Sequence, residues 1–96
     1  MRSAESIAGT AAIRAGECHI SSIVVHARPA ALDAVSAAIA GLAGAEVHAV
    51  DPSGKLVVVV TTDSEGTIGD HLGAINAMAG VLTASLVFHA VEQIET

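Results

Sequence analysis

Aromatic side chains and basic charge are both scarce in this sequence. Its 96 residues include one Phe and neither Trp nor Tyr. Proteins that bind single-stranded nucleic acid stack the bases on aromatic rings, and this chain has almost none to offer. Ten acidic residues against four Lys and Arg give a formal net charge of −6. An acidic chain repels a phosphate backbone and attracts a basic peptide, so we do not expect a nucleic-acid partner.

Cysteine and long apolar runs are scarce as well. Cys18 is the single cysteine, so no disulfide forms within the chain. No apolar run approaches the roughly 20 residues of a membrane-spanning helix. An export signal is a weak interpretation of the N-terminus, because Glu5 occupies the region that should be basic and the interrupted apolar stretch 7–13 ends at Arg14. We expect a cytoplasmic protein without direct membrane insertion.

Aliphatic side chains dominate what is present, since hydrophobic residues make up 52% of the chain. Residues 55–62, Lys-Leu-Val-Val-Val-Val-Thr-Thr, contain five consecutive apolar positions after a turn-forming segment. Branched side chains favour extended backbone, so this stretch predicts a strand. Because its apolar residues do not alternate with polar ones, both faces of the strand should be covered. We therefore place it at the centre of a sheet.

The other elements follow from periodicity and from turn residues. Apolar residues recur at helical spacing in two places, at Leu32, Val35, Ile39 and Leu42 and at Ile68, Leu72, Ile75 and Ala79. The pattern predicts a strand at 18–27, a helix from Pro29 that Gly44 ends, a strand at 45–50, a turn at 51–54, the central strand, a helix capped by Asp63 or Ser64 that Gly80 closes, and a strand at 81–90. Residues 1–17 are predicted to be a disordered extension, 18–90 the single domain and 91–96 an acidic tail.

The predicted order β-α-β-β-α-β contains two βαβ halves. Crossovers of this kind are right-handed, and two interleaved halves form an α+β ferredoxin-like sandwich. Its four-stranded antiparallel sheet carries both helices on one face. The strands at 18–27 and 55–62 would be central, which agrees with the apolar character of both of their faces.

The second face of this sheet has no predicted cover. We assign the bulkier rows to the helix face, namely Ser21, Ile23 and Val25, then Leu56, Val58 and Val60, then Leu82, Ala84, Leu86 and Phe88. The uncovered row then consists of Ile20, Ser22, Val24, His26, Val57, Val59, Thr61, Thr83, Ser85, Val87 and His89. An apolar patch of this size is typical of a binding surface. A homodimer that buries the same patch is the alternative.

Acidic residues are predicted around this uncovered face. Glu46, Asp51 and Asp63 form the candidate rim. Carboxylates at such positions are most often a solvated edge, and in the functional interpretation they attract a cationic partner.

Metal binding and catalysis find little support in the sequence. The five histidines never show the i, i+4 spacing of a helical metal pair. They are His19, His26, His48, His71 and His89. Heavy-metal carriers share the predicted fold but need a Cys pair in the first loop, which is absent. We expect no metal and no cofactor.

Phosphate chemistry is not expected either. Gly66, Gly69 and Gly73 lie in a predicted helix without a following lysine, so they do not form a P-loop. Acylphosphatases share the topology and use a loop Arg with an Asn. Arg28 and Asn76 are present, but Arg28 precedes a proline and has no glycine-rich cradle. We expect a binding protein rather than an enzyme.

Four stretches together resemble the NapD family, small cytoplasmic chaperones for assembly of the periplasmic nitrate reductase. They are Ser-Ile-Val-Val-His-Ala (22–27), Gly-Ala-Glu-Val-His-Ala-Val (44–50), Asp-Pro-Ser-Gly-Lys-Leu-Val-Val-Val-Val (51–60) and Gly-Val-Leu-Thr-Ala-Ser-Leu-Val-Phe-His (80–89). The last two are the most specific. The resemblance covers about residues 18–90, and the helices match in pattern rather than in identity.

The resemblance implies binding of the twin-arginine signal peptide of the nitrate reductase catalytic subunit, so that export waits for cofactor insertion and folding. A basic segment followed by an apolar one suits an acidic protein with an uncovered apolar sheet face. The peptide could lie on that face or pair as an extra strand with 45–50. We expect a monomer or a weak homodimer. The alternative function is a ferredoxin-like regulatory or self-associating module that binds a small ligand.

Overall fold

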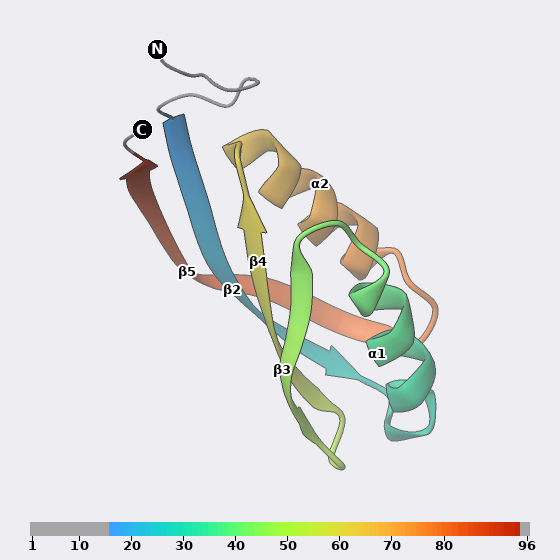
Figure 1. Ribbon diagram of the computed structural model, residues 1–96. Helices are drawn as coiled ribbons and strands as arrows, with labels where there is room; N and C mark the ends of the chain where they lie inside the picture. Colours follow the sequence, from blue (N-terminus) through green and yellow to red (C-terminus); the bar gives the residue numbers. More distant parts are fainter. Residues whose placement is uncertain (1–15, 95–96) are drawn as a thin grey trace.

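The computed structural model describes residues 16–94. Of the predicted disordered extension, residues 1–15 lie outside the described residues, whereas Gly16 and Glu17 belong to the first strand. Figure 1 shows the elements in chain order. They are β2 (Gly16–Ala27), the 3-10 helix η1 (Pro29–Ala31), α1 (Leu32–Ala40), β3 (Ala45–Asp51), β4 (Lys55–Thr62), α2 (Glu65–Asn76) and β5 (Val81–Ile94).

The four strands form one sheet in the order β3-β4-β2-β5. All three neighbouring pairs are antiparallel, and both helices pack on the same face (Figure 1). This is the predicted ferredoxin-like sandwich, with β2 and β4 at its centre. β4 is central as predicted, but the expected cover on both of its faces is found on one only. Leu56, Val58 and Val60 are buried under the helices, whereas Val57 and Val59 are half-buried on the face without helices.

The core lies between the helices and one row of each central strand. Ile23 and Val25 of β2 and Leu56, Val58 and Val60 of β4 are fully buried. The helices contribute the predicted stripe residues, with Leu32, Val35, Ile39, Ile68 and Ile75 all buried. The assignment of the helix face in β2 and β4 is therefore confirmed.

Both helices end earlier than the sequence pattern predicted. α1 ends at Ala40, and the chain reaches Gly44 through a turn in which Ala45 N donates to Leu42 O at 3.1 Å. Gly44 has a φ of +77° and packs so closely on the Thr61 carbonyl that a Cβ atom would collide with it. Gly44 is therefore needed for the approach to the sheet rather than for ending the helix.

α2 begins as predicted, because the Ser64 side chain accepts a hydrogen bond from Thr67 N at 3.2 Å. It ends at Asn76 rather than at residue 79. The Asn76 side chain bonds both backbone groups of Ala84, accepting from its N–H at 3.0 Å and donating to its carbonyl at 3.2 Å. These bonds join the end of the helix to β5. Met78 then packs against the core in place of the predicted Ala79, which is exposed.

β5 departs most from the prediction. Its pairing with β2 shifts register at two places, opposite the Ser22–Ile23 and His26–Ala27 steps. Val87 and Leu82 are the extra residues that have no Cα partner there. Beyond Val87 the alternation is inverted, because one added residue turns every later side chain to the other face.

The register shifts overturn the face assignments of Leu82, Phe88 and His89. Leu82 was predicted to face the helices, but it is the unpaired residue of one shift and is 57% exposed. Phe88 was predicted to face the helices, but it pairs with Ser22 on the opposite face and is 55% exposed. His89 was predicted on the uncovered row, but it pairs with Ser21 on the helix face.

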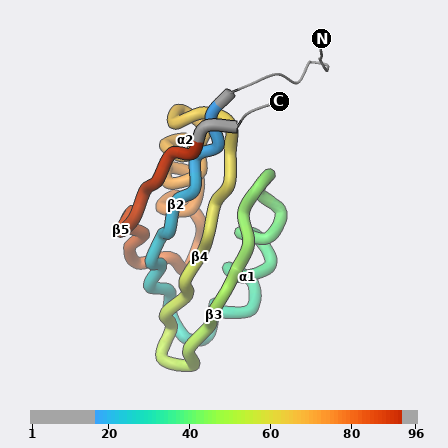
Figure 2. The backbone as a smooth tube through the Cα atoms, turned by 60° about the vertical axis from the view of Figure 1, so that its left-hand side comes forward, coloured from blue at the N-terminus to red at the C-terminus, as the bar shows by residue number. Residues whose placement is uncertain are grey.

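The predicted acidic tail at 91–96 is also wrong over residues 91–94. β5 continues to Ile94 because residues 91–94 pair with the first four residues of β2, so that Gly16 lies opposite Ile94. Figure 2 shows the start of β2 and the end of β5 side by side.

Candidate functional site

The face of the sheet opposite the helices is the candidate site, and we call it the open face. Strand register assigns residues to it in transverse rows. The upper rows are Thr61, Ile20 and Ala90, then Glu46, Val59, Ser22 and Phe88. The lower rows are Ala49, Val57, Val24 and Ser85, then Asp51, Lys55, His26 and Thr83. Strands lie about 4.8 Å apart, so the face is about 14 Å wide between the outer strands.

The predicted face residues thus come together, with two exceptions. Ile20, Ser22, Val24, His26, Val57, Val59, Thr61, Thr83 and Ser85 all lie on the open face. Val87 is an exception because it is the unpaired residue of the register shift, where it is 60% exposed. His89 is the other, because it lies opposite Ser21 on the helix face.

Sequence reasoning missed Phe88, the single aromatic residue of the chain. No residue pattern in 81–90 marks the register shift, since the local alternation is consistent with an unbroken strand. Ala90 and Glu92 were missed for a related reason. Glu92 pairs with Cys18, and Cys18 lies two residues before Ile20 in β2 and therefore on the same face. The sequence pattern had predicted a tail at Glu92.

The middle of the open face is apolar. Ile20, Val24, Val57 and Val59 are only half-buried, and Phe88 stands beside them. We call these five residues the apolar centre. Small hydroxyl residues, Ser22 and Ser85, lie between them, so no bulky polar side chain interrupts the apolar centre. Such a surface can bury an apolar ligand without having to desolvate a charge.

The predicted acidic rim is spread over the face rather than gathered at one point. Glu46 and Asp51 lie on the open face near opposite ends of the edge strand β3, and Asp63 is exposed in the turn before α2. Glu46 lies in the row of Val59 and Phe88. Its carboxylate is mostly exposed and lies 3.3 Å from His48 Nε2. Glu46 is therefore the rim residue that adjoins the apolar centre.

Asp51 has a structural task in the turn between β3 and β4. Its Oδ2 accepts hydrogen bonds from Ser53 Oγ and from Ser53 N, the latter at 2.9 Å. These bonds, followed by the attraction of Lys55, hold the pKa of the Asp51 carboxyl below its usual value. Its partner Lys55 and the exposed His26 lie in the same row. This end of the open face is therefore less acidic than the Glu46 end.

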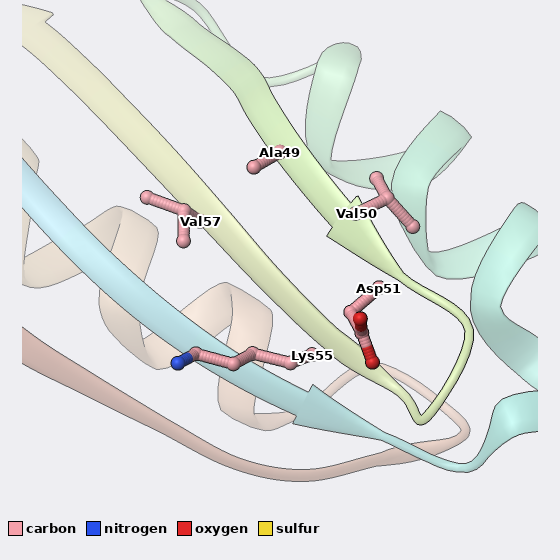
Figure 3. Close-up of a pocket in the computed structure, with 5 residues that line it drawn as sticks. All are labelled: Ala49, Val50, Asp51, Lys55 and Val57. Atoms are coloured by element: carbon pink, nitrogen blue, oxygen red, sulfur yellow. The ribbon is translucent and has the colours of Figure 1, made fainter.

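A hollow of about 320 Å³ opens near the β3–β4 turn. Ala49, Val50, Asp51, Lys55 and Val57 line it, and Figure 3 shows Lys55 extended across the neighbouring strand. The hollow borders the apolar centre at Val57. A ligand on the open face could extend into it.

Three polar residues form a chain on the other face. His19 Nε2 lies 3.0 Å from Glu17 Oε1, and His19 Nδ1 lies 3.0 Å from His89 Nε2. A carboxylate only accepts, so His19 carries its proton on Nε2 and, when neutral, accepts from His89 through Nδ1. His19 is 6% exposed. The chain of bonds therefore links β2 to β5 within the fold rather than presenting a reactive group.

Among residues 16–94, no group of three or more His, Cys, Asp or Glu side chains is arranged to hold a metal ion. In the same part of the chain, no helix has the length and apolar character needed to cross a membrane.

Comparisons with known proteins agree with the fold. A family model described as NapD protein matches residues 18–93. Chaperone NapD of Paracoccus pantotrophus is 44% identical over 73 residues, which are 76% of this chain and 64% of that protein. The chain thus aligns with less than two thirds of that relative. Chaperone NapD of Escherichia coli K12 is 33% identical over 75 residues, 77% of this chain and 86% of that protein.

A solved structure is similar as well. The solution structure of the E. coli Tat proofreading chaperone protein NapD superposes with a TM-score of 0.70 at 32% identity. The match covers 76% of this chain and 78% of that one.

Proposed function

Because the chain belongs to the NapD family, we propose that it is a chaperone that binds a twin-arginine signal peptide on its open face. The partner in this proposal is the signal peptide of the periplasmic nitrate reductase catalytic subunit, in the cytoplasm. Binding would delay export until cofactor insertion and folding are complete. The single observation that carries the proposal is the apolar centre, which neither helix covers.

The apolar centre suits the apolar segment of such a peptide. Burying a few hundred Å² of apolar surface is worth several kcal/mol at about 25 cal/mol per Å², before the cost of association. A helix with its side chains is about 10–12 Å across, which fits a face about 14 Å wide between its outer strands. Apolar contact should therefore supply most of the affinity.

The carboxylates suit the basic segment. Glu46 adjoins the apolar centre on one edge, and Glu92 lies beyond Ile20 and Ala90 at the end of β5. Each exposed pair between an arginine and a carboxylate is worth about 0–1 kcal/mol. Charge should therefore set the orientation and the association rate of the peptide more than its affinity.

Val59→Asp tests the proposal directly. It places a charge in the middle of the open face, where a bound apolar segment would have to desolvate it. We expect calorimetric affinity for a synthetic peptide with a twin-arginine pair and an apolar segment to fall at least tenfold, while the circular dichroism spectrum stays native. The matched control is Val91→Asp, since Val91 is 48% exposed on β5 but pairs with the buried His19, away from the open face.

Two results would contradict this site. Equal affinity of Val59→Asp and native protein would place the peptide elsewhere, and a proline in β3 would then test pairing at that edge. Equal loss in both variants would show a general effect of charge. Replacing the arginine pair by a lysine pair keeps the charge and removes the planar guanidinium groups, so weaker binding would show that arginine geometry is recognised.

Self-association is the second candidate function, favoured by the large apolar side chains exposed on the edge strand β5. They are Leu82, Leu86, Val87, Phe88 and Val91. Light scattering coupled to size exclusion distinguishes the two functions. A stable dimer without peptide affinity favours self-association, and a monomer that binds the peptide favours the chaperone. Binding of a small ligand in the hollow beside Val57, without peptide affinity, would instead favour a ligand-binding module.

A further inference from the structure

Residues 1–15 differ in charge from the rest of the chain. They contain Arg2 and Arg14, two of the four basic residues, and only one acidic residue, Glu5. Two positive charges less one negative charge give this segment a net charge of +1. Residues 16–96 therefore carry −7, so that the whole chain has the formal net charge of −6. The segment and the described domain therefore carry net charges of opposite sign.

The segment also matches the chemistry for which the open face is suited. Ile7 and Ile13 lie between the two arginines in a stretch otherwise made mostly of small residues. Arginine followed by small and apolar residues is the same combination that the proposed partner offers. A segment of this composition cannot form a core of its own, so burial of its two isoleucines requires another surface.

The place where the segment joins the domain favours the open face. Gly16 starts β2, which lies between β4 and β5 in the middle of the sheet. On the helix face, α2 starts directly after β4 at this same end of the sheet (Figure 1). On the open face, Cys18 with Glu92 and then Ile20 with Thr61 and Ala90 lead from the junction to the apolar centre.

The segment is long enough to cover that face. Fifteen extended residues reach up to about 50 Å, and the whole of β2 is about 40 Å long at about 3.3 Å per residue. A tether of this length gives an effective concentration on the order of 1 mM. A contact that would have a Kd of about 0.1 mM between separate molecules is then about nine-tenths formed within the chain.

We propose that residues 1–15 dock on the open face of their own domain and compete with the signal peptide for the apolar centre. This inference rests on the proposed function and adds that the N-terminal segment regulates binding of the signal peptide. While no partner is present, the two isoleucines shield the apolar centre from unrelated chains. A peptide must then displace the segment, which reduces its apparent affinity about tenfold at the occupancy estimated above.

The test uses the full chain with Ile7→Asp and Ile13→Asp combined. We expect calorimetric affinity for the synthetic twin-arginine peptide to increase about tenfold, since the altered segment no longer competes. The matched control, Ala34→Asp with Ala37→Asp, places the same two charges on exposed positions of α1. Unchanged affinity, or the same increase in the control, would overturn the inference.

A second measurement separates this inference from the proposed function, because it needs no added peptide. Methyl resonances of Val24, Val57 and Val59 are compared between the native chain and the double Ile variant. We expect shifts at these three residues and none at Val35, which is buried between α1 and the sheet. Such shifts support internal docking even if the synthetic peptide binds neither chain, in which case only the proposed function fails. Identical spectra overturn internal docking even if the peptide binds both chains.

Discussion

Ser21 is a polar residue inside the core, and its buried hydroxyl lowers the stability of the fold at β2. It is fully buried, and its Oγ has no hydrogen-bond partner among the described residues. A buried hydroxyl without a partner loses its hydrogen bonds to water and gains none in return. Its Cα lies opposite His89, so the polar pair at this position weakens the apolar core between the two strands.

Ser21→Ala should therefore stabilise the protein. We expect the free energy of unfolding to rise by about 1 kcal/mol in urea denaturation, because the unsatisfied hydroxyl is removed and almost no volume is lost. Ser22→Ala is the matched control, since it makes the same change on the adjacent, open-face position and should alter stability little. A decrease for Ser21→Ala would show that the hydroxyl has a partner in solution, with the His89 ring as the nearest candidate.

Turns fix the ends of the strands at the level of elements. Gly54 closes the turn between β3 and β4 with a φ of +112°, and its carbonyl accepts from Ala27 N at 2.7 Å. A Cβ atom there would collide with the Ala27 carbonyl. The close approach joins the β3–β4 hairpin to the end of β2 and so sets the register on which the open face depends.

Two glycine substitutions with opposite effects test this account. Gly54→Ala should lower the free energy of unfolding by at least about 2 kcal/mol, from left-handed backbone strain and the collision with the carbonyl. Gly69→Ala lies in α2 with open space around the new methyl group, so it should raise stability by about 1 kcal/mol through helix propensity. Thermal denaturation measures both. A neutral Gly54→Ala would mean that the hairpin can shift away from β2.

The helix ends show how elements depend on their neighbours. Periodicity predicted the apolar stripes of both helices correctly, because a stripe is a local consequence of 3.6 residues per turn. It extended each helix too far, since Leu42 and Met78 still pack against the core from turns. At Asn76, hydrogen bonds to Ala84 of β5 accompany the end of the helix. The sequence of the helix alone does not predict these bonds.

Net charge acts at the level of the whole molecule. The formal charge of −6 creates a field that accelerates the approach of a cationic peptide and that salt screens. We expect the association rate of the twin-arginine peptide to fall several-fold between about 50 and 500 mM salt, with little change in dissociation. Stopped-flow measurements with a labelled peptide check this prediction.

A pair of variants separates local from general charge in the same assay. Glu46→Gln removes a carboxylate beside the apolar centre and should slow association, whereas Asp70→Asn removes an exposed charge from α2 on the other side of the sheet. Equal effects of the two variants would show that only the total charge matters and that the peptide does not approach Glu46.

The central strands, the ferredoxin-like order and the faces of β2 and β4 could all be predicted from the residues alone. Residues 55–62 suffice to identify β4, because branched side chains favour extended backbone and an unbroken apolar run is typical of a central strand. Composition likewise determined the acidic character of the surface. These properties depend on neighbours along the chain.

Which side chains of β5 face the helices depends on how β5 pairs with β2 in the folded sheet. Counting alternate residues placed Phe88 inside and His89 outside, whereas pairing with β2 reverses them by making Val87 an extra residue. The reversal brings His89 to the buried His19 at 3.0 Å and leaves the single aromatic ring on the open face. Alternation is a local property, but a register shift depends on the partner strand, and here that partner lies about 65 residues away along the chain.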